Sequence, residues 1–433
     1  MTKRIQDGIY YNKTISDSFQ RLTDISNQKN KTFALLFLRV KEGRTAREVG
    51  ACLANLWMIY DSLRRGFVKA LRGYHVPSGG LDVLIGYGPK IFDLQGVKKK
   101  IPNDLCGRQF SPSTTGEEPI IRGAGIRYAS DLHDNVGLIE HVVIQFISAT
   151  QLATYRAIAE TWQFFSNDTR VPFVFTSFYT GFQRDDGRSW LGFHDEVSNM
   201  KNAQERKGII AIHKKWNHLI HDDFWTENGT YLAFLRIAID LKTWENIQSE
   251  QQELLVGRDK ISGRPIIAVD KRGNPILDET CPTIDELNGY SPKFHDHPNY
   301  FLEPNVKPGL KSTIDVNASL KILNLSHIGR TRHIEEIDCR DPSSNRIFRQ
   351  GFEFIESTND PAKPVRVGLN FVSFQNDPRR LFSLLANPHW LGNSNFGGDG
   401  SNNNMNGLFS VNAAGIFLVP PVEKPFPGCS IFI

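Results

Sequence analysis

Short apolar runs and longer stretches with helical spacing alternate along this 433-residue chain. A short apolar or alternating run bounded by turn residues is typical of a half-buried or buried strand. Such runs occur in both halves of the chain and predict strands over 31–40, 79–88, 141–149, 229–241 and 367–375.

Apolar residues that recur every three to four positions predict four helices. These helices cover 45–71, 150–165, 242–257 and 377–387. Thr45 suits the N-cap of the first helix, and Gly257 suits the end of the third. The fourth begins with Asp377 as N-cap and Pro378 at its first helical position.

Each half therefore reads strand–helix–strand, which predicts an α+β fold of two domains, each an antiparallel sheet covered by helices. We expect a polar N-terminal arm over 1–30, a first domain over 31–200 and a second over 201–433. A stretch rich in Pro, Gly, Asp and Asn, at about 264–312, indicates an insertion in the second domain. The Gly/Asn-rich stretch 391–409 is either a flexible loop or a functional lid.

Composition and charge limit the function classes. Hydrophobic residues make up 40% and charged residues 23%, as in ordinary globular proteins, and the net charge of +4 is too small to indicate nucleic acid or a membrane surface. The five cysteines are odd in number and form no CxxC pair, which favours a reducing compartment. The N-terminus lacks the apolar core of a secretion signal, and no stretch is apolar enough to span a bilayer. We therefore expect a cytoplasmic protein.

Several common catalytic motifs are missing. The segment RGAGIRYAS lacks the third glycine of a dinucleotide-binding loop, and neither a P-loop nor a GxSxG elbow occurs. His218 and His221 are close enough in sequence to share a metal, but no third ligand clusters with them. His295 and His297 lie in the expected insertion, where surface polarity is the simpler interpretation.

Three segments combine residues that can carry chemistry. Asp195 lies in a glycine-containing turn, within WLGFHDEVSN, where it either caps the turn or reacts. His327 precedes two arginines, within LSHIGRTR, which is either a ligand site or a surface basic cluster. Arg349 lies in an alternating stretch, NRIFRQGFEF, which predicts a strand. An Arg on a strand among Phe and Ile needs a carboxylate or an oxyanion partner, because an unpaired buried charge is costly.

These segments resemble the dye-decolourising peroxidase family. The family carries a GxxDG motif, a proximal His in a segment like HIxRxxxR, a distal Arg in a segment like RIxRRG, and then a GLxF strand. This chain offers Gly192-Phe-His-Asp195, His327-Ile-Gly-Arg330, Arg346-Ile-Phe-Arg349-Gln-Gly351 and Gly368-Leu-Asn-Phe371 in the same order. Residues 230–263 are also similar to the family's second-domain strand and helix, which end in GRxK. The resemblance covers roughly residues 140–400.

The resemblance implies two tandem ferredoxin-like domains, with antiparallel sheets flanked by helices and a b-type haem held mainly by the second. The long insertion and the absent secretion signal look like the larger, cytoplasmic branch of the family. The activity implied is reduction of hydrogen peroxide through a ferryl intermediate, with oxidation of bulky organic donors such as dyes and phenolics. A homo-oligomer is left open.

The resemblance also implies roles for individual residues. His327 would be the axial ligand of the haem iron, since neutral imidazole is a good iron ligand. Asp195 would shuttle a proton on the distal side, and Arg349 would stabilise negative charge there. The remaining cofactor contacts would be Arg330 and Arg332 to the haem propionates, with Leu369 and Phe371 covering the distal face. Bulky donors would react at the haem edge or at a surface aromatic residue, for which Trp190, Trp216, Trp225 and Trp390 are candidates, although packing is the simpler role for each.

Two positions depart from the family pattern. Glu196 replaces the last glycine of GxxDG, which puts the aim of Asp195 in doubt, and Gly329 stands where many members have Arg. Two alternatives therefore stay open: a haem-handling protein that binds or strips iron porphyrin without turnover, and a non-haem interaction protein on the same fold.

Overall fold

A computed structural model describes residues 6, 32–102, 104–105, 140–194, 199, 203–213, 221–278, 313–315, 317–319, 326–327, 346–378, 380–381 and 408–433. The first half contains, in order, β1 (Thr32–Val40), α1 (Ala46–Arg64), β2 (Asp82–Tyr87), β3 (Val142–Ser148), α2 (Gln151–Ser166) and β4 (Phe173–Phe182). Its strands form an antiparallel sheet in the order β4-β1-β3-β2.

The second half repeats this strand order. After α3 (Ala203–Ile210) it contains β5 (Thr230–Ile239), α4 (Leu241–Glu245), α5 (Ser249–Val256), β6 (Ile266–Val269), β7 (Pro275–Leu277), β8 (Phe348–Ser357), β9 (Val365–Gln375) and β10 (Phe409–Val419). Its main sheet runs β10-β5-β9-β8, which is again fourth, first, third, second along the chain. Two α+β units with the same strand order follow one another, so the predicted tandem ferredoxin-like fold is confirmed.

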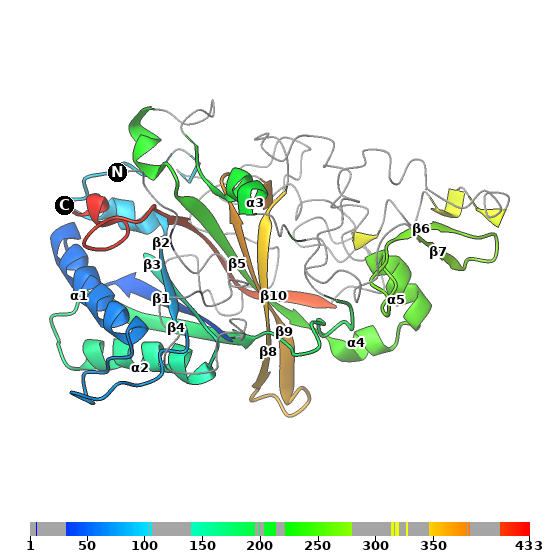
Figure 1. The fold of residues 1–433 in the computed structure, drawn as a ribbon, viewed down its shortest axis with the longest axis horizontal. Coiled ribbons are helices and arrows are strands. Elements are labelled where there is room, and N and C mark those ends of the chain that lie inside the picture. Colours follow the sequence, from blue (N-terminus) through cyan, green and yellow to red (C-terminus); the bar gives the residue numbers. More distant parts are fainter. Residues whose placement is uncertain are drawn as a thin grey trace.

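The two sheets close into one eight-stranded barrel. In Figure 1, α1 and α2 lie at one end of the molecule and the β6–β7 hairpin at the other. Closure depends on two seams, each with a single register pair: Tyr87 of β2 with Leu418 of β10, and Phe182 of β4 with Glu353 of β8. This closure was not predicted from the sequence, and it buries both faces of most strands.

A side chain from the N-terminal arm reinforces the β2–β10 seam. Gln6 is 2% exposed, and its amide donates to the carbonyl oxygens of Ile85 (3.1 Å) and Pro420 (2.8 Å). Its amide oxygen accepts a hydrogen bond from the backbone N–H of Ile85 at 2.9 Å. The arm therefore contributes at least one structural residue.

The barrel interior is one apolar core shared by both halves. Phe33 of β1 stacks on Phe352 of β8 with ring centroids 4.6 Å apart. Phe37, also on β1, contacts Phe234 of β5 at 5.6 Å and Phe417 of β10 at 6.1 Å. Because side chains alternate along a strand, the intervening residues of β1 face outward, where they share an apolar cluster with residues of α1 and α2.

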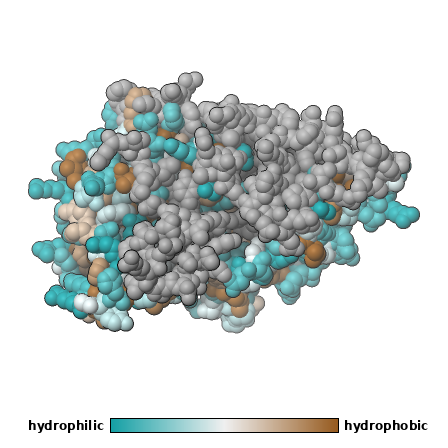
Figure 2. Space-filling view, viewed as in Figure 1, coloured by the Kyte–Doolittle hydropathy of each residue, from teal (hydrophilic) through white to brown (hydrophobic). Residues whose placement is uncertain are grey.

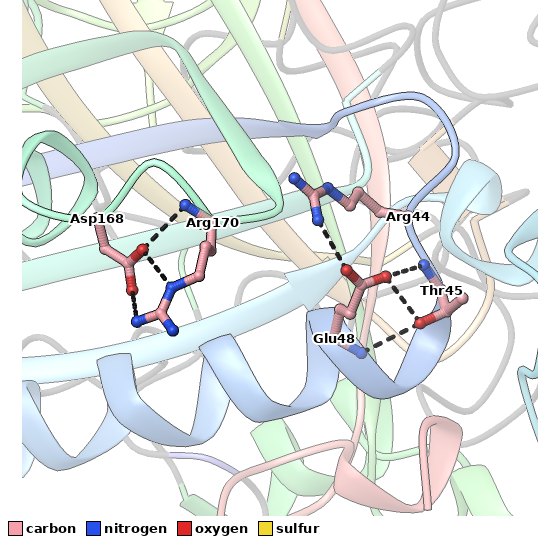
Figure 3. Close-up of polar contacts among 5 residues, drawn as sticks. All are labelled: Arg44, Thr45, Glu48, Asp168 and Arg170. Carbon is pink, nitrogen blue, oxygen red and sulfur yellow. Dashed lines mark hydrogen bonds and ion pairs between the residues drawn. The ribbon is translucent and has the colours of Figure 1, made fainter.

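Helix α1 begins where the sequence predicted. The Thr45 side chain accepts from the backbone N–H of Glu48, whose carboxylate accepts from the Thr45 backbone N–H at 2.8 Å. Arg44 donates to the same carboxylate at 2.8 Å (Figure 3). Close by, Asp168 accepts from the backbone and guanidinium of Arg170. Hydrogen bonds from the Thr45 backbone, then from Arg44, lower the pKa of Glu48 from 4.5 to about 2.

Several expectations for the elements were wrong. The helix expected over 45–71 ends at Arg64, because Gly66 takes a left-handed backbone with φ +78°. The helix expected over 242–257 is broken into α4 and α5. At the break, the Gln252 amide donates to the carbonyl oxygens of Trp244 (2.7 Å) and Ile247 (3.0 Å). In a continuous helix, backbone N–H groups would donate to these oxygens instead.

Strands β4 and β10 were not predicted at all. Of the helix expected over 377–387, the structure describes Arg380 and Leu381 as helical, and most of the remaining residues lie outside the described part. Most of the insertion expected at 264–312 also lies outside it, although its first part forms the β6–β7 hairpin.

Three features of the described residues bear on the class of protein: surface hydropathy, helix length and cysteine pairing. On the face shown in Figure 2, hydrophobic residues of the described part lie scattered among hydrophilic ones. Within the described residues, no helix is both long and apolar enough to cross a bilayer. Cys52 and Cys429, the two cysteines in the described part, form no disulfide.

Candidate functional site

Strands β8 and β9 turn alternate side chains to opposite faces of the second sheet. Phe348 and Phe352 of β8, and Val372 and Phe374 of β9, belong to the barrel core. Their odd-numbered neighbours must therefore point outward. Three of the predicted site residues, Arg349, Leu369 and Phe371, are among them and so share the outer face.

The register places these residues in adjacent rows. Arg349 pairs with Ser373, and two residues along β8, Gly351 pairs with Phe371. Arg349 and Phe371 are therefore diagonal neighbours, about 7–8 Å apart. The next row pairs Leu369 with Glu353. We call Arg349, Gly351, Leu369 and Phe371 the outer patch.

Along this face, the outer patch lies between a buried end at Ser373 and an exposed end at Ile355 and Val365. Its four residues are half-buried, whereas Ser373 at its edge is fully buried. On the far side of β9, the register partners from β5 are Ala233, Leu235 and Ile237, which are at most 5% exposed. A cation beside two apolar side chains on a rigid sheet can hold an apolar ligand and an anionic group together.

Gly368 lets β9 lie close to its neighbours beneath the patch. A Cβ at this position would lie 2.0 Å from the carbonyl oxygen of Ile237 and 2.7 Å from the Phe354 ring. Phe354 in turn lies under the guanidinium of Arg236, 3.6 Å from the ring centroid. No side chain fits here, so contacts inside the barrel explain why the first residue of the GLxF segment is glycine.

Arg236, 2% exposed, fixes the strands from inside the barrel. It donates to Asn370 at 2.7 Å and to Glu356 of β8 at 2.6 Å. Asn370 lies between Leu369 and Phe371, and its amide donates to the carbonyl oxygen of Thr180 on β4 at 2.9 Å. One buried cation therefore links three strands of the second sheet, and through Asn370 also reaches β4.

The turn that leads to Asp195 is tied to the second half. Gly192 has φ +88°, a conformation that favours glycine. The Arg188 guanidinium donates to the carbonyl oxygens of Gly192 and Lys260, each at 2.6 Å. The Trp190 indole donates to the carbonyl oxygen of Phe354 at the far end of β8, at 3.2 Å.

Helix α4 and the segment that follows α5 also contact this turn. The Trp244 indole donates to the Leu191 carbonyl oxygen at 3.2 Å and contacts the Phe193 ring edge-on at 6.4 Å. The Lys260 ammonium lies 5.5 Å from the centre of the Phe193 ring and donates to Gln252. Partial burial lowers the pKa of Lys260. The GRxK segment therefore supports the turn before Asp195, a contact that spacing along the chain could not reveal.

Asn199 carries a contact that the sequence analysis missed. It is 5% exposed, and its amide donates to the Arg349 carbonyl oxygen at 2.6 Å. The Arg349 backbone N–H donates back to the Asn199 amide oxygen at 3.2 Å. Asn199 belongs to the motif segment quoted for Asp195, but nothing in the sequence connects it to Arg349, which is 150 positions away.

The other predicted site residues are described in part. His327 is half-buried, and its Nδ1 atom is shielded from solvent. Asp195, Glu196, Arg330 and Arg332 lie outside the described residues. The structure therefore brings together Arg349, Leu369 and Phe371, while the roles of all these residues stay predictions. Among the described residues, no three His, Cys, Asp or Glu side chains group as a metal site.

Two of the four candidate tryptophans are described. Trp190 is half-buried and lies 5.0 Å from the guanidinium of Arg184. Trp225 is 8% exposed and packs near Phe92. Trp216 and Trp390 lie outside the described residues.

Solved structures with a similar fold cover nearly the whole chain. The DyP-type peroxidase from Cellulomonas bogoriensis matches with a TM-score of 0.62 and 16% identity, over 94% of both chains. Ferric DtpA from Streptomyces lividans gives 0.62 and 17%, over 93% of this chain and 92% of that one. A DypB variant from Rhodococcus jostii in complex with heme gives 0.54 and 14%, over 90% and 93%.

Sequence comparisons lead to the same family. A deferrochelatase from Yersinia pestis bv. Antiqua is 22% identical over 302 residues, which are 68% of this chain and 59% of the relative. The match thus spans about three fifths of that relative's length. The model of the C-terminal region of Dyp-type peroxidases matches residues 186–424, more than half of the chain, and the chain therefore belongs to the Dyp-type peroxidase family.

Proposed function

We propose that the chain binds a b-type haem against the outer patch and uses it to reduce hydrogen peroxide while oxidising a bulky organic donor. The observation that carries this proposal is the outer patch itself. Arg349, Leu369 and Phe371 share the outer face of β8 and β9, where all three are half-buried. Membership of the Dyp-type peroxidase family supports the same activity.

The residue types suit a haem. His327 offers an imidazole for the iron, because neutral imidazole is a good iron ligand. Leu369 and Phe371 offer apolar contact for a porphyrin face, while Arg330 and Arg332 would pair with its propionates. When bound, the haem supplies the redox chemistry, and the chain supplies ligand, acid–base group and anion stabiliser.

Two residues of the chain would act on hydrogen peroxide. Asp195 would take a proton from one oxygen of hydrogen peroxide and return it to the other, which would leave as water, and the haem, when bound, would supply the two electrons for this cleavage. Arg349 stabilises the negative charge that develops as the oxygen–oxygen bond breaks. Leu369 and Phe371 exclude bulky donors from this space, so these donors react at the haem edge or at the protein surface.

The first test is the absorption spectrum of the protein reconstituted with hemin, before and after one equivalent of hydrogen peroxide. We expect a haem spectrum that changes with peroxide and returns when a dye is added. A protein that refuses hemin would remove the haem assignment and favour an interaction protein on the same fold.

A haem-handling protein is the second candidate, because the curated relative from Yersinia pestis carries the name deferrochelatase. A hemin-loaded protein whose spectrum ignores peroxide would favour this candidate. Metal-free porphyrin, recovered after incubation with hemin, would support it directly.

The roles of Arg349 and Asp195 have separate tests. Arg349→Leu should slow the single-turnover reaction with peroxide by about 100-fold, the loss typical of a removed charge-stabilising donor, and leave hemin affinity unchanged. Loss of hemin instead would assign Arg349 a structural role. Because the usual pKa of Asp is about 3.9, we expect an acidic optimum. An optimum at neutral pH or above, with Asp195→Asn harmless, would exclude Asp195.

A further inference from the structure

Strand β8 has a neighbouring strand along only one of its edges at Arg349. It pairs with β9 from Phe348 to Ser357, but with β4 only through Glu353 and Phe182. At Arg349 no described strand covers the edge opposite β9. The Asn199 side chain occupies this edge, bound to both the N–H and the carbonyl of Arg349.

Asn199 supplies what a strand residue would supply. In an antiparallel ladder, every second pair of facing residues exchanges one N–H···O bond in each direction. A primary amide presents one donor and one acceptor on the same side, and Asn199 uses both on one residue. It thereby satisfies two backbone groups of Arg349 and fixes the strand where its ladder is incomplete.

We propose that Asn199 is a positioning residue for Arg349. This inference rests on the proposed function, in which the Arg349 guanidinium stabilises charge on peroxide. The Arg349 side chain leaves the outer face from a backbone that β9 holds on one edge and Asn199 on the other. Without Asn199, only β9 holds this end of β8. The backbone of Arg349 can then move, and the guanidinium moves with it.

The same contact restricts the other predicted catalytic residue. Asn199 follows Asp195 by four residues, a chain length that spans at most about 14 Å when fully extended. Since the Asn199 side chain is bound to the backbone of Arg349, it limits how far the Asp195 backbone lies from that strand. The Asn199 side chain therefore restricts the distance between the backbones of the two predicted catalytic residues, Asp195 and Arg349.

The chain contains a matched control at the opposite seam of the barrel. Gln6 makes the same two-way contact with the N–H and carbonyl of Ile85, at 2.9 and 3.1 Å. Gln6→Ala removes an equivalent amide bridge from β2, a strand that contributes nothing to the outer patch. It reports what a lost amide bridge costs in stability, without touching the Arg349 backbone.

The first readout uses haem-free protein. Hydrogen exchange, followed by mass spectrometry on overlapping peptides across β8, should show the Arg349 amide exchanging at least about tenfold faster in Asn199→Ala. Gln6→Ala should leave this amide unchanged. If Asn199→Ala does not fold, Asn199→Asp serves in its place: it keeps the shape and the acceptor but loses the donor to the Arg349 carbonyl.

The second readout uses hemin-loaded protein in single turnovers with hydrogen peroxide. We expect Asn199→Ala to slow the reaction about tenfold at unchanged hemin affinity, and Gln6→Ala to leave the rate within twofold. In the Arg349→Leu background, Asn199→Ala should change the rate by less than twofold, because the residue it positions is gone.

Three results would overturn the inference: an unchanged rate in Asn199→Ala, an equal loss in Gln6→Ala, or a full tenfold loss on top of Arg349→Leu. Failure of the proposed function looks different. The wild-type protein would refuse hemin, or Arg349→Leu would react at the wild-type rate. Either result removes the catalytic part of the inference, while hydrogen exchange still decides whether Asn199 holds Arg349.

Discussion

Replacing Gln6 by Ala should destabilise the whole barrel, although the residue lies in a polar N-terminal arm. The change leaves three backbone groups without their partner: the N–H and carbonyl of Ile85 and the carbonyl of Pro420. Ile85 is 0% exposed, so its N–H has no access to water in the native fold. A buried polar group that loses its partner costs about 1–3 kcal/mol.

The three groups will not each cost the full amount. A carbonyl oxygen has two lone pairs and is more easily satisfied by a water that enters the space left by the side chain. We take the full cost for the unpaired N–H and part of that cost for each of the two carbonyls. The expected loss of unfolding free energy is then about 2–4 kcal/mol. This is a large share of the roughly 5–15 kcal/mol that stabilises a typical native protein.

Urea unfolding of the haem-free protein measures this loss, from the shift of the midpoint at unchanged slope. Gln163→Ala is the matched control, because Gln163 is exposed on α2 and should change stability by less than about 0.5 kcal/mol. A Gln6→Ala variant within about 0.5 kcal/mol of the wild type would refute the reasoning and leave Gln6 as a contact without energetic weight.

Two further predictions concern the scaffold. Gly368→Ala should cost at least about 2 kcal/mol in the same urea assay, because its Cβ would lie 2.0 Å from the Ile237 carbonyl oxygen and β9 would have to move; a fully stable variant would contradict this packing. The pKa of Glu48 falls from 4.5 to about 2 on folding, so its contribution to stability is present above pH 4.5 and is lost as the pH falls toward 2. Glu48→Gln should therefore flatten the decline of stability with acid over this window, and parallel curves for the variant and the wild type would show that the carboxylate contributes nothing.

The sequence predicted well the elements whose signal is local. β1, β3 and α2 occur within a residue or two of their expected ranges, because unbroken apolar runs and helical spacing are written into adjacent residues. Thr45 forms the expected cap because capping needs only residues three positions apart. The break between α4 and α5 was missed, because the Gln252 side chain that satisfies it acts across the gap.

For the candidate site, too, local features were predicted from the sequence and long-range contacts were not. The order of the motifs along the chain indicates the family, and the family is confirmed. The alternation of apolar residues placed Arg349 on a strand, but not on a particular face. The face follows from the register of β8 with β9 and from which side closes into the barrel. Asn199 was missed because no periodicity links residues 150 positions apart.

By itself, the sequence determined the α+β class, about half of the described strands, the longer helices, and the residues that resemble a haem peroxidase. These depend on local propensity and on motif order, which a single chain displays directly. The tertiary structure alone decided that two sheets close into one barrel, that Gln6 bridges the β2–β10 seam, that Asn199 binds the edge of β8, and that Arg349, Leu369 and Phe371 share one half-buried patch. Each of these depends on hydrogen bonds and packing between distant segments, and such contacts form only once the chain has folded.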